Sequence, residues 1–119
     1  MFPSYLLQKV YLKGSLKNNE DGYEFALKNI VDTGTLVGLN PLVVDGESIP
    51  PAMVRLVSNG EEVYGNQITQ RNPMPLPVQA QAHFVVKGDP LSPGQHEIAI
   101  SLVTREIGLV KFKITDMIE

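Results

Sequence analysis

The sequence alternates apolar and polar residues with a period of two in several short segments, and this alternation restricts the fold most. Tyr23, Phe25 and Leu27 share one face of a predicted strand, while Glu24 and Lys28 lie on the other. The apolar faces of the other segments are formed by Val78, Ala80, Ala82 and Phe84, by Ile98, Ile100 and Leu102, and by Val110, Phe112 and Ile114. One apolar and one polar face are typical of antiparallel sheets with a solvated side.

Turn signals separate these segments. Asp45-Gly46 and Asn59-Gly60 tolerate the positive φ that tight hairpin turns require. The loop Lys87–Gln95 is predicted to close a hairpin, Arg105–Gly108 is predicted to reverse the chain, and residues 51–53 are predicted to form a short helical turn. Short strands with frequent turns predict an all-β fold, a single antiparallel β-sandwich domain of residues 1–119.

Composition excludes several function classes. The 119 residues are 43% hydrophobic, contain no cysteine and carry a formal net charge of −3. Lys and Arg are scattered, so no basic patch predicts nucleic-acid binding. No segment approaches the ~18–20 apolar residues of a membrane span. The start of the chain lacks the pattern of a signal peptide, so a cytoplasmic location without membrane association is expected.

No group of residues forms a recognisable catalytic motif. His83 and His96 have no neighbouring His or carboxylate at a metal-ligand spacing, so solvent-facing histidines are favoured over metal or acid–base roles. The pairs Glu20-Asp21 and Glu61-Glu62 flank turn glycines, which favours solvated turn charges over acid–base chemistry. We therefore predict no catalytic, cofactor-binding or metal-ligating residue in this chain.

A proline-rich arm at residues 71–77 is the main shift in composition. Its three prolines alternate with Met74 and Leu76 and remove three backbone donors, so it cannot form a central strand. Two interpretations remain open. The arm is either a rigid crossover whose two apolar side chains cover the core, or an exposed, pre-ordered segment that docks on a partner.

Several phrases together resemble a known family. They include YLKGSLKN, DGYEFALKN, GLNPLVVDGESIP, the proline-rich arm and LSPGQHEIAISLVTREIGLVKFKITDMIE. Through them the chain resembles the small β subunit of bacterial C-glycoside deglycosidases over nearly its whole length. The most distinctive pieces are Gly14–Asn18, Asp45–Pro50 and Leu91–Ile100, which are phrases of the fold rather than catalytic signatures.

That resemblance implies a carbon–carbon lyase that cleaves 3-keto C-glycosides by β-elimination. It implies a sugar-isomerase-like TIM-barrel α subunit as the partner, which carries the catalytic base and a divalent metal, usually Mn²⁺. This chain would then be a non-catalytic subunit without a cofactor of its own. The predicted partner interface comprises Arg71, Pro73, Met74, Pro75, Leu76 and Pro77.

Two other function classes stay open. One is a stand-alone β-sandwich module that binds carbohydrate or serves as a structural interaction module. Carbohydrate modules stack sugars on exposed aromatic side chains, and this chain has no Trp and no evident platform among its four Tyr residues. The other is a purely structural homo-oligomer.

Overall fold

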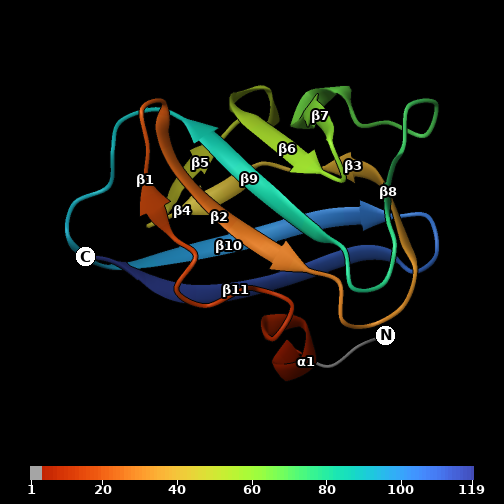
Figure 1. Ribbon diagram of the computed structural model, residues 1–119, viewed down its shortest axis with the longest axis horizontal. Helices are drawn as coiled ribbons and strands as arrows, with labels where there is room; N and C mark the ends of the chain where they lie inside the picture. The colour runs from red at the N-terminus through yellow and green to blue at the C-terminus, as the bar shows by residue number, and fades with distance from the viewer. Residues whose placement is uncertain (1–3) are drawn as a thin grey trace.

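Two antiparallel sheets packed face to face form the molecule, which we describe from a computed structural model covering residues 4–119 (Figure 1). One sheet lies in front in this view, and the other, with its two longest strands, lies behind it. The predicted all-β sandwich is therefore confirmed. Alternation explains the arrangement, because strands such as β6, β9, β10 and β11 bury one face between the sheets and leave the other more exposed.

The front sheet contains five strands in the order β1-β2-β9-β6-β7. Their bounds are β1 Lys17–Asn18, β2 Gly22–Lys28, β6 Val54–Ser58, β7 Glu61–Tyr64 and β9 Gln81–Lys87. The long central pair is β2 and β9, in which Phe25 lies opposite Phe84. The rings of these two residues stack with their centroids 5.0 Å apart, so this pair forms the middle of the front half of the core.

The back sheet is built around β10, which is paired on both sides. Its strands are β3 Gly34–Leu39, β4 Leu42–Val44, β5 Glu47–Ile49, β8 Met74–Leu76, β10 Gly94–Thr104 and β11 Gly108–Ile118. The strand β11 pairs with β10 along its full length, while β4 and β3 follow one another along the opposite side of β10. Strands β5 and β8 continue the sheet from β4 and β3 respectively.

The core between the sheets is largely aliphatic, as the shortage of aromatic residues predicts. The residues that are less than 2% exposed are Phe25, Phe84, Leu27, Leu36, Leu42, Leu56, Ile98, Ile100, Val54 and Val86. On β11, Phe112 and Ile114 are buried and Lys111 and Lys113 are exposed, as predicted, whereas Val110 is only half-buried. Val78, predicted to face inward, is 45% exposed because it precedes β9 rather than belonging to it.

Most predicted turns are confirmed. Asp45 and Gly46 have φ values of 52° and 84° in the β4–β5 turn, and Asn59 and Gly60 have 51° and 78° in the β6–β7 turn. The segment 105–108 reverses the chain between β10 and β11, and Pro51–Met53 forms the 3₁₀ turn η1. Two further short elements, α1 Ser4–Gln8 and the 3₁₀ turn η2 Gly65–Gln67, were not predicted, since such short segments show no helical periodicity.

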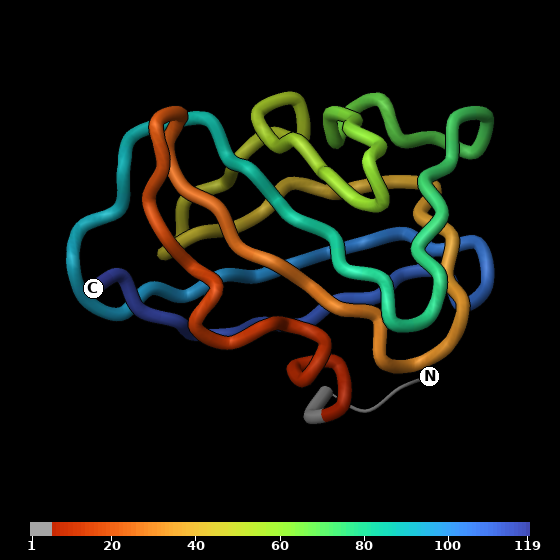
Figure 2. The backbone as a smooth tube through the Cα atoms, viewed as in Figure 1, coloured from red at the N-terminus to blue at the C-terminus, as the bar shows by residue number. Residues whose placement is uncertain are grey.

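The loop Lys87–Gln95 does not close a hairpin. Strand β9 belongs to the front sheet and β10 to the back sheet, so this loop carries the chain from one sheet to the other (Figure 2). Figure 2 shows it as the cyan tube that passes around one end of the sandwich. Gly and Pro residues correctly predicted a break in the chain, but they do not specify which sheet the next strand joins.

Candidate functional site

The proline-rich arm contributes to the core of this chain. Met74 and Leu76 are 3% and 7% exposed, and both lie in the edge strand β8, which pairs with β3. Of the two interpretations, the crossover that covers the core is the one that the structure shows. Both side chains belong to the buried core of this chain, and contact between them and a partner stays a prediction.

The other residues of the predicted interface are more accessible. Arg71, Pro75 and Pro77 are exposed, and Pro73 is half-buried. Alternation explains the difference, because Met74 and Leu76 point inward from β8 while Pro75 points outward. Contact between the exposed residues and a partner stays a prediction.

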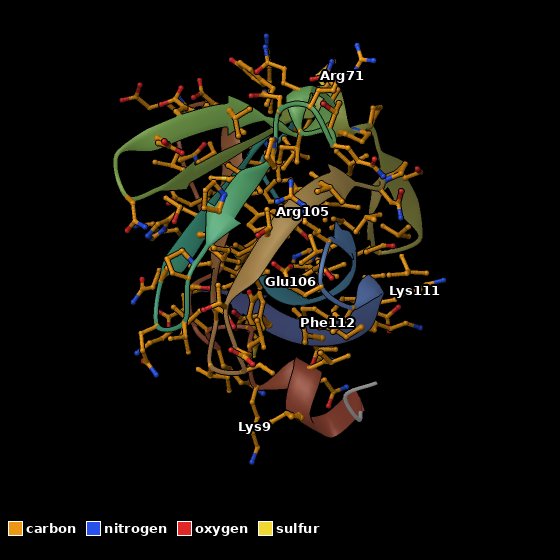
Figure 3. All side chains as sticks on the ribbon, turned by 90° about the vertical axis from the view of Figure 1, so that its right-hand side faces the viewer. Lys9, Arg71, Arg105, Glu106, Lys111 and Phe112 are labelled. Carbon is orange, nitrogen blue, oxygen red and sulfur yellow. The ribbon has the colours of Figure 1, made fainter. Side chains whose placement is uncertain are left out.

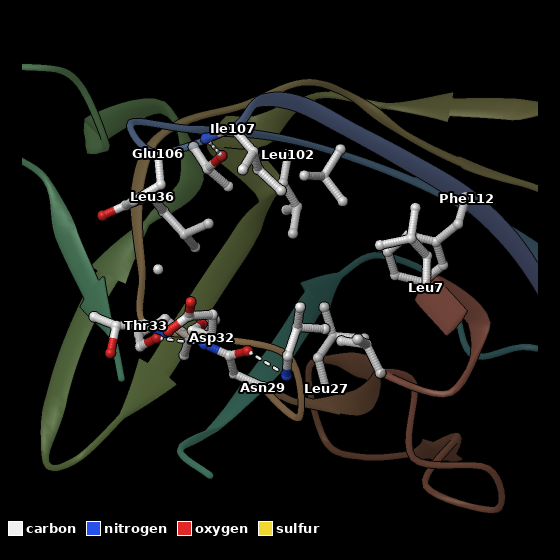
Figure 4. A pocket seen from close by; sticks show the side chains of 16 residues that line it. Leu7, Leu27, Asn29, Asp32, Thr33, Leu36, Leu102, Glu106, Ile107 and Phe112 are labelled. Carbon is white, nitrogen blue, oxygen red and sulfur yellow. Dashed lines mark hydrogen bonds between the residues drawn. The ribbon is translucent and has the colours of Figure 1, made fainter. Parts of the chain in front are cut away.

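An apolar cavity of about 190 Å³ lies between the sheets at the end of the sandwich where β8 and the β10–β11 turn meet. Figure 4 shows its walls, with Leu36 and Leu102 on one side, Leu27 opposite, and Phe112 and Leu7 at the far end. The back sheet and the segment between β2 and β3 supply most of the lining, and Leu7 of α1 contributes on one side. The cavity is therefore bounded by the back sheet, Leu27 of the front sheet, and the segments that connect the strands at this end.

Asn29 holds one wall of this cavity. Its side-chain amide nitrogen donates to the carbonyl oxygens of Asp32, at 2.6 Å, and of Leu76, at 2.7 Å. Its side-chain oxygen accepts a bond from the backbone N–H of Val31 at 3.1 Å. Asn29 is 8% exposed, so these bonds satisfy a buried amide and fix the turn between β2 and β3 against β8.

Glu106 and Thr104 hold the opposite wall. The carboxylate of Glu106 accepts bonds from the backbone N–H of Thr35, at 2.9 Å, and from its hydroxyl, at 2.8 Å. The Thr35 hydroxyl bond lowers the pKa of Glu106, so this carboxyl is ionised at neutral pH. The Thr104 hydroxyl donates to the carbonyl of Gly108 at 2.9 Å and accepts from the N–H of Ile107, which closes the turn. Figure 3 shows this end of the molecule, with Glu106 and Phe112 facing the viewer.

His96 is the buried titratable group at the other end of β10. Its Nδ1 lies 2.5 Å from Oδ2 of Asp45 and its Nε2 lies 2.7 Å from the carbonyl oxygen of Ser92. Both partners are acceptors, so both ring nitrogens must carry a proton, which makes the ring a cation. The Asp45 bond, followed by the Ser92 bond, raises the pKa of His96, and the His96 bond lowers the pKa of Asp45. The imidazolium thus ties the β4–β5 turn to the inter-sheet loop.

The predicted solvent-facing position of His96 is wrong, since the residue is only 6% exposed, whereas His83 is exposed as predicted. The sequence did contain the relevant signal. His96 has the same parity as Ile98 and Ile100, so alternation along β10 places it on the inward face. No local spacing reveals its partner Asp45, which lies 51 residues away.

Asp116 is a second buried polar group that sequence reasoning missed. Its Oδ2 accepts bonds from the hydroxyl of Tyr11, at 2.8 Å, and from the backbone N–H groups of Gly14, at 2.9 Å, and Leu16, at 3.3 Å. Burial raises the pKa of this carboxyl, but the bond from Tyr11 and those from backbone amides outweigh burial, so the pKa is lowered. Asp116 therefore anchors the N-terminal segment to β11.

The acidic pairs that flank turn glycines are solvated. Glu20-Asp21 and Glu61-Glu62 are exposed, as predicted for turn charges. A wider and more polar groove beside β5 contains the carboxylates of Asp45, Glu47 and Asp89. Within residues 4–119, no group of three or more His, Cys, Asp or Glu side chains is arranged to hold a metal ion.

Comparison with known proteins gives one family. A protein-family model described as hydroxymethylglutaryl-CoA reductase, N-terminal domain, matches residues 6–119. No curated protein matches the chain.

In the part of the chain that the structure describes, no helix is long and apolar enough to cross a membrane.

This match overturns the resemblance to the β subunit of C-glycoside deglycosidases, and with it the expected lyase activity. The phrases that supported the resemblance form strands such as β2, β10 and β11 and the turns that join strands. The segment 45–50, for example, contains the β4–β5 turn and β5, which specify a sandwich rather than a reaction. The metal-bearing barrel partner and the 3-keto glycoside were implied by that resemblance alone, so they lose their basis with it.

Proposed function

The chain belongs to the family of the hydroxymethylglutaryl-CoA reductase N-terminal domain, and on this basis we propose that it is a non-catalytic interaction domain that binds a catalytic polypeptide. Among the function classes that the sequence left open, this is the structural interaction module.

One observation supports this proposal most strongly. Among the described residues, every buried side-chain nitrogen or oxygen has a hydrogen-bond partner within the chain itself. His96 and Asp116, the two buried groups with the chemistry of an acid or a base, are held by acceptors and donors of the fold. A general acid or base needs access to the substrate proton that it transfers, and neither group has it.

Carbohydrate binding receives less support than protein binding. Among the described aromatic side chains, Tyr64 is the one with large exposure, at 47%. It lies at the end of β7 without a second exposed aromatic ring beside it. A sugar-binding face requires a flat apolar platform, and a single tyrosine offers little of that area.

The family suggests the first partner to test, the catalytic domain of a hydroxymethylglutaryl-CoA reductase. Purified chain and catalytic domain are mixed, and complex formation is measured by size-exclusion chromatography with light scattering. We expect co-elution, and we expect no reductase activity from the chain alone. Turnover by the isolated chain would contradict the proposal. Separate elution of the two proteins, at concentrations well above the dissociation constant of a specific complex, would contradict it too.

A matched variant makes the test specific to the native fold. Asp116→Ala removes a buried anchor of the fold, whereas Asp89→Ala removes an exposed carboxylate of the same kind. If binding requires the folded domain, Asp116→Ala should bind the catalytic domain less well at temperatures near its own melting temperature. Asp89→Ala should bind as the native chain does at the same temperatures. Equal association by the unfolded chain would indicate nonspecific binding.

A further inference from the structure

We propose that the apolar cavity at the β8 end of the sandwich is a binding site for a small, neutral, apolar molecule the size of one aromatic ring with a short alkyl group. The inference rests on the cavity alone and does not depend on the proposed polypeptide partner.

The size of the cavity sets the size of the ligand. Its volume is about 190 Å³. An engineered, enclosed apolar cavity of about 150 Å³ with a similar lining stays dry and binds benzene, and the present cavity, which is partly open to solvent, has a comparable volume. This cavity therefore has room for a ring and one or two further carbon atoms.

The chemistry of the walls selects an apolar ligand. Leucine, valine, isoleucine and phenylalanine side chains supply most of the lining. The polar groups among the lining residues, chiefly Asn29, Thr104 and Glu106, already make hydrogen bonds within the chain. A ligand with a buried polar group would lose its hydrogen bonds to water without replacement, which is unfavourable.

Charge at the rim excludes anions. Asp32 and Glu106 contribute two carboxylates to the lining, and the described lining contains no Lys or Arg. An anionic ligand would approach these carboxylates without a compensating cation. Neutral ligands are unaffected, so a neutral molecule and its anionic isostere should bind differently.

The walls are held in place before a ligand arrives. Asn29 joins the β2–β3 turn to β8, and Glu106 joins the β10–β11 turn to Thr35 in β3. These bonds fix both sides of the cavity against the sheets. A preformed site loses little conformational entropy on binding, which favours the affinity for a small ligand.

The test uses toluene as the probe and benzoate as its anionic isostere. Both are titrated into the isotopically labelled chain, and binding is followed through the backbone amide resonances by NMR. We expect toluene to shift the amides of lining residues such as Leu102 and Val110 in a saturable way and to raise the melting temperature. Benzoate at the same concentrations should do neither.

Three variants locate the site. Val110→Phe fills the cavity from β11, and Gly34→Leu fills it from β3, where a new Cβ would have no neighbour closer than 3.7 Å. Leu109→Phe is the matched control, because this neighbouring side chain is 59% exposed and does not line the cavity. Both filled variants should lose saturable toluene binding, and the control should retain it.

Melting curves first establish that each variant is folded. If Val110→Phe does not fold, Gly34→Leu alone serves as the filled variant. The proposal is overturned if toluene causes no saturable shifts at lining residues in the native chain. It is also overturned if folded filled variants bind toluene as the native chain does, or if benzoate binds equally well.

Discussion

Replacing Asp116 with alanine should destabilise the chain more than any other change of a single polar residue considered above. The carboxylate is 5% exposed and anchors the N-terminal segment through Tyr11, Gly14 and Leu16. Gly14 is exposed, so water can replace the bond to its N–H group. Tyr11 and Leu16 are buried, so both donors would lose their bond to the carboxylate in a place that water does not readily reach.

The magnitude follows from those two donors. An unsatisfied buried donor costs about 1–3 kcal/mol, and a hydrogen bond to a charged group contributes about 1.5–3 kcal/mol. The two buried donors together lead us to expect that Asp116→Ala lowers the free energy of unfolding by about 2–6 kcal/mol. Urea denaturation at neutral pH, followed by circular dichroism, measures this loss. Asp89→Ala, which removes an exposed carboxylate, is the control and should change little.

The pH dependence gives a second test of the same reasoning. The pKa of Asp116 is lower in the folded chain than in the unfolded chain. Its contribution to stability is therefore fully present above the unfolded pKa of about 3.9 and is lost as the pH falls through the folded pKa. The stability difference between the native chain and Asp116→Ala should shrink in acid. A loss below about 1 kcal/mol at neutral pH, or a difference that does not depend on pH, would refute the anchoring role.

Three further predictions follow from the core and from His96. Phe112→Ala should cost about 3–5 kcal/mol in urea melts, because the ring is 6% exposed, while Lys113→Ala on the opposite face should change little. The double change Met74→Ser plus Leu76→Ser should cost at least about 4 kcal/mol, because both side chains lie in the core; an unchanged melting temperature would show that they do not. His96 has a raised pKa in the folded chain, so its contribution is fully present below about pH 6.5 and is lost as the pH rises through the folded pKa. Melting temperatures measured across this range should fall with rising pH in the native chain and not in His96→Gln, and equal slopes would contradict the role of the imidazolium.

Alternation and turn chemistry predicted the strands, because both are local properties of the chain. Ile98, Ile100 and Leu102 mark the inward face of β10 without any knowledge of what covers them. Asp45-Gly46 identifies a hairpin because the turn itself requires positive φ at both positions. The loop between β9 and β10 was misassigned, because the choice of sheet depends on the packing of distant strands.

The candidate site was less predictable than the fold for a physical reason. A cavity is space that side chains leave empty, and its lining comes from segments between residues 7 and 112 that meet only in the folded chain. The inward position of the buried polar groups could have been predicted from the sequence. Asp116 has the parity of Phe112 and Ile114, so alternation places it inside, although it does not reveal Tyr11 as its partner.

The two ends of the sandwich interior differ in a way that separates stability from binding. His96 lies directly opposite Asp116 in the pairing of β10 with β11, so both buried ionisable groups occupy one end. Thr104 lines the cavity eight residues further along β10, which is about 26 Å at a strand rise of about 3.3 Å per residue. Changes at His96 and at Thr104, which share no partner, should affect the free energy of unfolding nearly independently, whereas Asp116 anchors the N-terminal segment that also supplies Leu7 and Val10 to the cavity. The polar end therefore holds the segment around residues 11–16 and the β4–β5 turn in place, while the opposite end of the sandwich keeps its apolar cavity.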